Sequence, residues 1–277
     1  MAMFRTTVLL AALMGLFIGV GFILGGIPGL VIAFVLGLGM NFFAYWSSDK
    51  LALRMAGAKE VTPEEQPHLH RMVAEVAKLA ELPTPKVYVI QNDAPNAFAT
   101  GRNPAHAAVA VTTGIMDILT ERELRAVIGH ELGHVKNRDI LISSMVATIA
   151  GAISMLAFIS LFMRRSQYGF IAVMVAWIVA PIVAGIIQAA ISRTREYQAD
   201  RTGAELTRDP ASLATALEKL HQGIKERPME ATPMAESTAH LYIVHPFKAG
   251  GLANLFSTHP PMEERVKRLR DMAYKRT

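Results

Sequence analysis

His130-Glu131-Leu132-Gly133-His134 matches the pattern H-E-x-x-H. On a helix, residues four apart lie on the same face, so both imidazoles can reach one Zn²⁺. Glu131 then lies close enough to act as a general base on a water molecule at the metal. The alternative is a helix with two ordinary surface histidines. The motif therefore predicts a metal and a hydrolytic reaction, and the rest of the chain has to support them.

The residues on either side of the motif predict the helix that it needs. Thr120-Glu121-Arg122-Glu123 is a capping box, which begins a helix, and we expect that helix to end near Asn137. Ile140, the first residue of a long apolar run, follows soon after His134. The predicted metal site therefore lies close to an apolar segment.

The composition favours a membrane protein and restricts the metal ligands. Of the 277 residues, 52% are hydrophobic and 18% are charged. The chain has no cysteine, so a metal site has to use His, Asp and Glu, and disulfides are excluded. The net charge is +5, but the basic residues are scattered, so we expect no nucleic-acid partner.

Three long runs without charge predict two membrane-spanning hairpins, because one helix needs about 20 apolar residues to cross a bilayer. The run from Thr6 to Ser48 holds two such helices, with a turn at 25–29. A cleaved signal peptide fits less well, since a second span follows at once. The runs 140–163 and 166–192 predict a second hairpin, for which a buried hairpin in a soluble core is the alternative.

The spans divide the chain into four parts. We expect a transmembrane hairpin at 1–48, the first half of a catalytic domain at 49–139, a second apolar hairpin at 140–192, and the second half of the domain at 193–277. Basic residues follow the second and fourth spans. The positive-inside rule therefore predicts a multi-pass protein whose polar parts and both termini are cytoplasmic.

The polar part between the hairpins predicts helices around a small sheet. Thr62 and Pro63 begin a helix that runs to about Leu82. Strands are expected at 86–90 and 107–113. We therefore predict a mainly α fold with a small antiparallel β-sheet, an α+β metallopeptidase core, plus the two hairpins.

A third metal ligand is needed, because catalytic zinc sites normally have three protein ligands and a water molecule. Glu196 and Asp200, four residues apart on a predicted helix, lie just after the second hairpin. One carboxylate can bind the metal, and the other can accept the N–H of a ligating imidazole. The alternative is a pair of surface carboxylates.

Together these segments carry a family resemblance along almost the whole chain. The matching segments are the N-terminal apolar hairpin, Asn96-Ala97-Phe98-Ala99, the stretch from His130 to Asp139, the stretch from Glu196 to Asp200, and Ser257-Thr258-His259-Pro260-Pro261. The chain resembles the HtpX-type bacterial membrane zinc metalloproteases. These are heat-shock endopeptidases of the gluzincin group, related to the CaaX prenyl proteases.

The resemblance implies a role for each matching residue. His130, His134 and Glu196 would hold one Zn²⁺ per chain, and Glu131 would be the catalytic base. Asp200, and less directly Asp139, would support the ligating histidines. His259 would approach the metal and stabilise an oxyanion, although a histidine in a stiff loop is an equal alternative. The edge strand Asn96-Ala97-Phe98-Ala99 would bind extended polypeptide.

The resemblance implies a zinc endopeptidase of the bacterial inner membrane that degrades misfolded or damaged membrane proteins under stress. Its partners would be polypeptide substrates and the lipid bilayer. The main alternative is a membrane chaperone, scaffold or transporter with a structural or coincidental metal motif. Processing of prenylated peptides is less well supported, because it would need a large chamber built from more spans than four.

Overall fold

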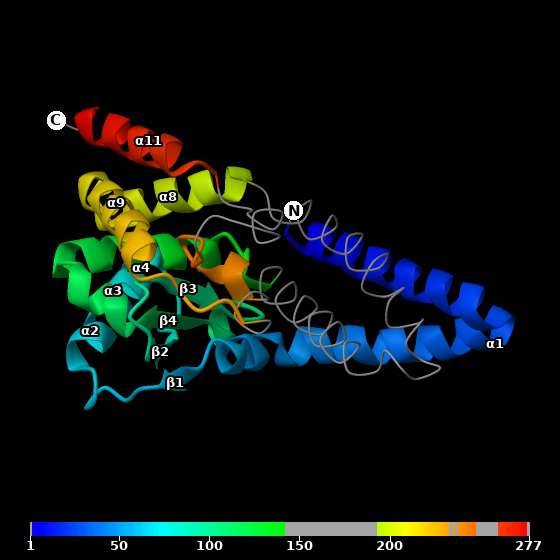
Figure 1. Cartoon of the computed structure of the whole chain (residues 1–277). Helices are drawn as coiled ribbons and strands as arrows, with labels where there is room; N and C mark the ends of the chain where they lie inside the picture. Colours follow the sequence, from blue (N-terminus) through cyan, green and yellow to red (C-terminus); the bar gives the residue numbers. More distant parts are fainter. Residues whose placement is uncertain (1, 142–192, 233–234, 236–237, 248–259, 276–277) are drawn as a thin grey trace.

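The structure is a computed structural model that describes residues 2–141, 193–232, 235, 238–247 and 260–275. A helical arm extends from a body in which helices cover a small sheet (Figure 1). Most of the second apolar hairpin, at 142–192, and His259 lie outside the described residues.

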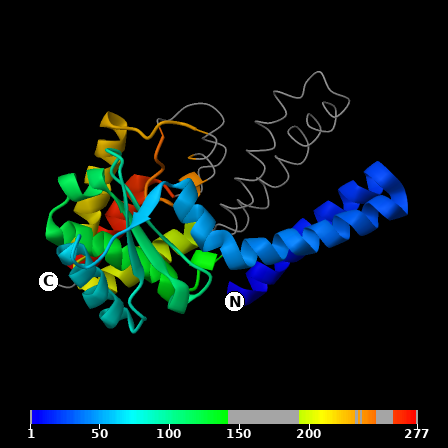
Figure 2. The ribbon, with the colours of Figure 1, turned by 90° about the horizontal axis from the view of Figure 1, so that it is seen from below.

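The arm is the helix α1, Ala2–Met55, which contains Pro28. It folds back on itself at the tip far from the body (Figures 1 and 2). Gly26, within the expected turn, has a φ of 59°, a left-handed value that glycine adopts without strain. Within the described residues, no helix has the length and apolarity required of a membrane span.

The sheet has four strands in the order β1-β2-β4-β3. Their bounds are Ala58–Glu60, Lys86–Ile90, Ala108–Thr112 and Ala97–Thr100 for β1, β2, β4 and β3. β1 pairs antiparallel with β2, and β3 pairs antiparallel with β4, whereas β2 and β4 are parallel. The prediction of an antiparallel sheet was therefore wrong, and the sheet is mixed. In the chain, β3 lies between β2 and β4 and runs opposite to both of them, so β2 and β4 point in the same direction.

Apart from α1, the described α-helices lie on one face of the sheet. α4 (Glu121–Lys136) lies nearest to the strands, with α8 (Arg193–Thr207) and then α11 (Met262–Tyr274) beyond it (Figure 1). α2 (Pro67–Ala80), α3 (Thr113–Ile118) and α9 (Pro210–Glu226) complete this side. Two short 3₁₀ helices lie at Pro104–His106 and Ala239–Leu241.

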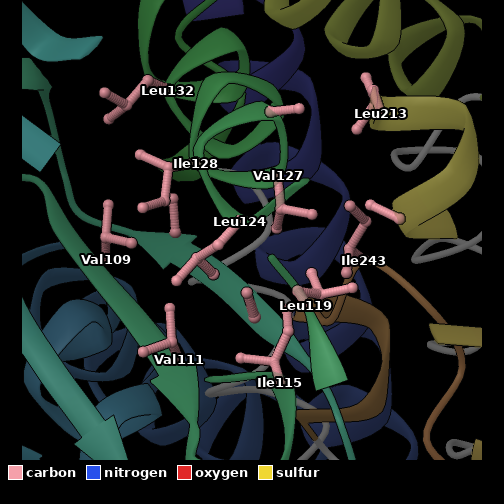
Figure 3. Packing of buried hydrophobic residues seen from close by; sticks show 14 of the residues in the cluster. Val109, Val111, Ile115, Leu119, Leu124, Val127, Ile128, Leu132, Leu213 and Ile243 are labelled. Carbon is pink, nitrogen blue, oxygen red and sulfur yellow. The ribbon is translucent and has the colours of Figure 1, made fainter. Parts of the chain in front are cut away.

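Alternation along the strands separates two apolar clusters. Val109 and Val111 of β4 point to the helical face, where they pack near Ile128 and Leu124 of α4 (Figure 3). Ala110 of β4 points to the other face, where Leu53 of α1 packs. Successive side chains of a strand alternate between faces, so the buried apolar positions of a strand divide between the two clusters.

The predicted helix starts were partly right. The capping box at Thr120 is present and begins α4, as predicted. Thr62 and Glu65 also exchange backbone-to-side-chain hydrogen bonds, but they close only a turn, and α2 begins at Pro67. Pro67 lacks an N–H, so the first helical position suits it. The helix predicted from Thr62 therefore starts later than expected.

Close contact between α4 and α8 depends on glycines. A Cβ added to Gly203 of α8 would lie 2.5 Å from the backbone nitrogen of His130. A Cβ added to Gly129 of α4 would lie 2.6 Å from Cγ2 of Thr207 and 3.1 Å from the carbonyl oxygen of Gly203. The two backbones approach so closely only because neither glycine carries a side chain.

Gly203→Ala tests this close approach. The added methyl group has to push the α4 backbone away, so we expect the free energy of unfolding to fall by about 1–3 kcal/mol. Denaturant unfolding of the purified chain measures the change. Gly39→Ala is the matched control, because its Cβ would meet nothing within 4 Å. Equal stability of the two variants would contradict the packing described here.

Candidate metal centre

Three possible ligands converge between α4 and α8. Nε2 of His134 lies 3.5 Å from Oε1 of Glu196, and Nε2 of His130 lies 3.9 Å from Oε2 of the same carboxylate. One ligand atom from each residue lies within 4.8 Å of the others. Ligand atoms about 2.1 Å from one tetrahedral ion stand roughly 3.4 Å apart. The three side chains therefore nearly have the spacing of a metal site.

His130 fits a metal ligand on its own chemistry. It is completely buried, and within the described part of the chain its Nε2 has no hydrogen-bond partner. A buried polar atom left without a partner costs free energy. Burial also lowers the pKa of His130, which favours the neutral imidazole that binds metals. A cation facing Nε2 would supply the missing partner.

Each histidine has a carboxylate behind it, and each carboxylate has an arginine. Nδ1 of His130 lies 2.9 Å from Oδ1 of Asp200, which is bound in turn by Arg265. Nδ1 of His134 lies 3.6 Å from Oδ2 of Asp139, and Nε of Arg195 lies 3.5 Å from that residue's Oδ1. A carboxylate at Nδ1 turns Nε2 of the imidazole toward a metal.

Glu131 lies beside this group and is buried. Its carboxylate accepts a hydrogen bond from the backbone N–H of Ala99 in β3, while its Oε1 has no hydrogen-bond partner among the described residues. Burial, with the charge of Glu196, raises the pKa of Glu131 to about 7. The general base predicted from the motif therefore stands between the histidine pair and the sheet edge.

Acidic side chains outweigh burial in their effect on the charge of His134. Burial lowers the pKa of His134, but Asp139, Glu196 and Glu131 raise it more strongly, to about 9 in the metal-free chain. Burial raises the pKa of Asp200, yet Arg265 and His130 bring it down to about 2. The acids thus attract positive charge into the site, and a divalent cation would compete with the proton on His134.

β3, which contains most of the predicted peptide-binding strand, is an edge strand of the sheet. Part of its outer edge is already bonded within the chain. The N–H of Ile243 donates to the carbonyl of Ala97 at 3.0 Å, and Asn96 exchanges two side-chain hydrogen bonds with the backbone of Val244. Phe98 points to the face of the sheet opposite α4 and packs on Tyr242. Residues 243–244 therefore lie where a bound peptide was expected.

Sequence reasoning missed Arg265. This residue is fully buried and binds Asp200 through two nitrogens, at 2.7 and 2.8 Å. A signal was present, because Met262, Val266 and Leu269 form the apolar stripe of a helix and Arg265 lies within that stripe. An arginine on an apolar helix face indicates a buried acidic partner.

His134→Ala tests the ligand set. Removing a ligand should weaken Zn²⁺ binding by more than about 100-fold, since loss of a residue that only supports a ligand already costs 10–100-fold. Chelator competition and metal analysis of the purified chain measure the loss. His106→Ala, an exposed histidine, should bind zinc like the unmodified chain. Unchanged zinc affinity in His134→Ala would exclude the centre.

Comparison with known proteins gives the same picture. Residues 63–273 match the model of peptidase family M48. A protease HtpX homolog of Burkholderia cenocepacia is 54% identical over 274 residues, covering 97% of this chain and 96% of the relative. Homologs from Methylibium petroleiphilum and Persephonella marina are 53% and 52% identical, each covering at least 96% of both chains.

A more distant likeness exists to a solved structure. The crystal structure of Ste24p from S. mikatae aligns with a TM-score of 0.45 and 19% identity, and the alignment covers 90% of this chain and 66% of that one. The family match spans most of the sequence, and the curated relatives match nearly all of it. The chain therefore belongs to peptidase family M48 and is a metalloprotease.

Proposed function

We propose that this metalloprotease is a zinc endopeptidase attached to the bacterial inner membrane, and that it cleaves misfolded or damaged membrane proteins. The observation that carries the proposal is the gathering of His130, His134 and Glu196, with the buried Glu131 beside them at the edge of the sheet. All donor atoms are nitrogen or oxygen and there is no cysteine, which suits a catalytic Zn²⁺. Membership of a peptidase family sets aside the chaperone, scaffold and transporter alternatives.

In this proposal each residue has one task. Bound zinc would act as a Lewis acid toward a water molecule and the scissile carbonyl. Glu131 takes the proton from the attacking water and delivers it to the leaving amine, and the Ala99 N–H holds its carboxylate in place. Asp200 and Asp139 orient the imidazoles. His259 is the proposed group that stabilises the oxyanion.

The edge of β3 is the proposed binding place for extended polypeptide. A strand edge binds main chain through backbone hydrogen bonds with little dependence on sequence, which suits a protease for damaged proteins. Ile243 and Val244 already bond to Ala97 and Asn96. Ile243 and Val244 therefore occupy the edge at these two residues, and a substrate would pair with other positions of β3.

Attachment to the membrane is proposed from the apolar segments. The run from Thr6 to Ser48 has no charge, and many large apolar side chains of α1 are exposed. They include Phe22, Ile27, Val31, Ile32, Phe34, Val35, Leu36, Leu38, Phe42 and Phe43. Large contiguous apolar surface favours contact with lipid or protein over water. Since α1 leads directly into the body, the metal centre would work beside the bilayer.

Glu131→Gln tests the reaction. The variant should keep its zinc, because Glu131 is not among the three ligands, and it should lose at least about 100-fold in cleavage rate. The assay places the chain in vesicles with a reporter membrane protein, once folded and once with a destabilised cytoplasmic loop. Preferential cleavage of the destabilised form supports the substrate class.

Glu205→Gln is the control for this experiment, since Glu205 lies exposed on α8 and pairs with Arg201. It should cleave like the unmodified chain. Cleavage at the unmodified rate by Glu131→Gln would show that another group is the base. Equal cleavage of both reporter forms would count against damaged membrane proteins as the substrate class.

The topology is tested with single cysteines, to which the cysteine-free chain is well suited. In intact membranes, Ser257→Cys should react with an impermeant thiol reagent only from the cytoplasmic side. Ser166→Cys should react only from the opposite side. Labelling of both positions from one side would show that the second hairpin does not cross the bilayer.

A further inference from the structure

Arg265 of α11 is the largest fully buried side chain of the described structure. Its Nε and one terminal nitrogen bind the two oxygens of Asp200 at 2.8 and 2.7 Å. The other terminal nitrogen donates to the carbonyl oxygen of Ile243 at 2.9 Å and lies 3.7 Å from Oε2 of Glu196. One guanidinium group thus joins α11 to two other segments of the chain, α8 and the segment at Ile243.

These contacts lead in two directions. Through Asp200, Arg265 is connected to His130, whose Nδ1 lies 2.9 Å from Asp200. Through Ile243, Arg265 is connected to the proposed peptide-binding edge of β3, because the N–H of Ile243 donates to the carbonyl of Ala97. The planar guanidinium has donors in fixed directions, so it can hold both segments at a set distance.

We propose that Arg265 is a positioning residue, which fixes the zinc ligands His130 and Glu196 relative to the peptide-binding edge of β3. The proposal rests on the proposed zinc site. Arg265 itself contacts neither metal nor substrate in it. It acts through Asp200, which orients His130, and through Ile243, which adjoins the edge.

The competing explanation is that Arg265 only docks α11 onto the body. The chain offers a matched comparison for that role. Arg270, on the same helix, binds Glu218 of α9 with contacts of 2.8 and 2.9 Å, but both side chains are largely exposed and Glu218 lies outside the ligand set. Substitution of Arg270 tests docking of α11 without touching the centre.

The experiment compares Arg265→Lys with Arg270→Lys in the full-length chain carrying Glu131→Gln, which avoids self-cleavage. Lysine keeps the charge but cannot bind both oxygens of Asp200 and the Ile243 carbonyl together. Arg265→Lys should weaken Zn²⁺ binding about 10–100-fold, as loss of a supporting partner does. The absorption spectrum of Co²⁺ at the site should change as well. Arg270→Lys should alter neither.

Thermal unfolding with chelator present separates folding from metal binding. A lower unfolding temperature of Arg265→Lys, with unchanged Zn²⁺ affinity and Co²⁺ spectrum, would mean that Arg265 only docks the helix, and would overturn the proposal. If the parent chain binds no zinc, the proposed function fails and this proposal fails with it.

A second variant covers the case in which Arg265→Lys does not fold. The pair Asp200→Asn with Arg265→Met removes both buried charges, a change that folded proteins often tolerate. The asparagine keeps an acceptor oxygen beside His130, but the methionine cannot hold that side chain in place as Arg265 does. Zinc binding should again weaken about 10–100-fold. Zinc affinity equal to that of the parent chain would overturn the proposal.

Discussion

The close approach of α4 and α8 is the constraint on which the rest of the structure depends. Gly203 lies against the backbone of His130, and Gly129 lies against Thr207 and Gly203. Helix axes normally stand 8–10 Å apart, and small residues at the crossing allow the closer end of that range. The segment 137–192 separates the two helices in sequence, yet this contact brings Glu196 and Asp200 to the two histidines.

The same contact creates an electrostatic problem, because it buries charged groups. Glu131, Glu196 and Asp200 are all nearly inaccessible to water. Burying a charge without a partner is costly, so such groups are expected to be paired or to bind metal. Arg265 balances Asp200, and Arg195 lies beside Asp139. The remaining negative charge at Glu131 and Glu196 is what a divalent cation would balance.

Much of this centre could be predicted from short-range patterns. The capping box at Thr120, the spacing of His130 and His134, and the spacing of Glu196 and Asp200 are local, and helix geometry turns each spacing into a shared face. The sheet was harder to predict. Strand direction depends on which strands pair. Because the strand Ala97–Thr100 lies between β2 and β4 in the chain and pairs antiparallel with β4, β4 runs parallel to β2. Two local signals for a helix start lie close together, the hydrogen bonds between Thr62 and Glu65 and the proline at position 67. The helix α2 begins at the second of them.

Contacts between distant segments left weaker signals in the sequence. Arg265 showed as an arginine on an apolar face, but its partner Asp200 could not be read from α11 alone. Nothing in the local pattern indicated that Ile243 and Val244 would bond to the edge of β3. Such pairings form because the folded chain has to satisfy buried hydrogen-bonding groups, and that requirement only becomes specific in three dimensions.

Anomalous diffraction at the zinc absorption edge, on crystals of the full-length Glu131→Gln chain, tests the central claim most directly. We expect one strong peak about 2.0–2.2 Å from Nε2 of His130, Nε2 of His134 and a carboxylate oxygen of Glu196. The absence of a peak at this position, with zinc present in the crystal or bound only elsewhere, would contradict the account.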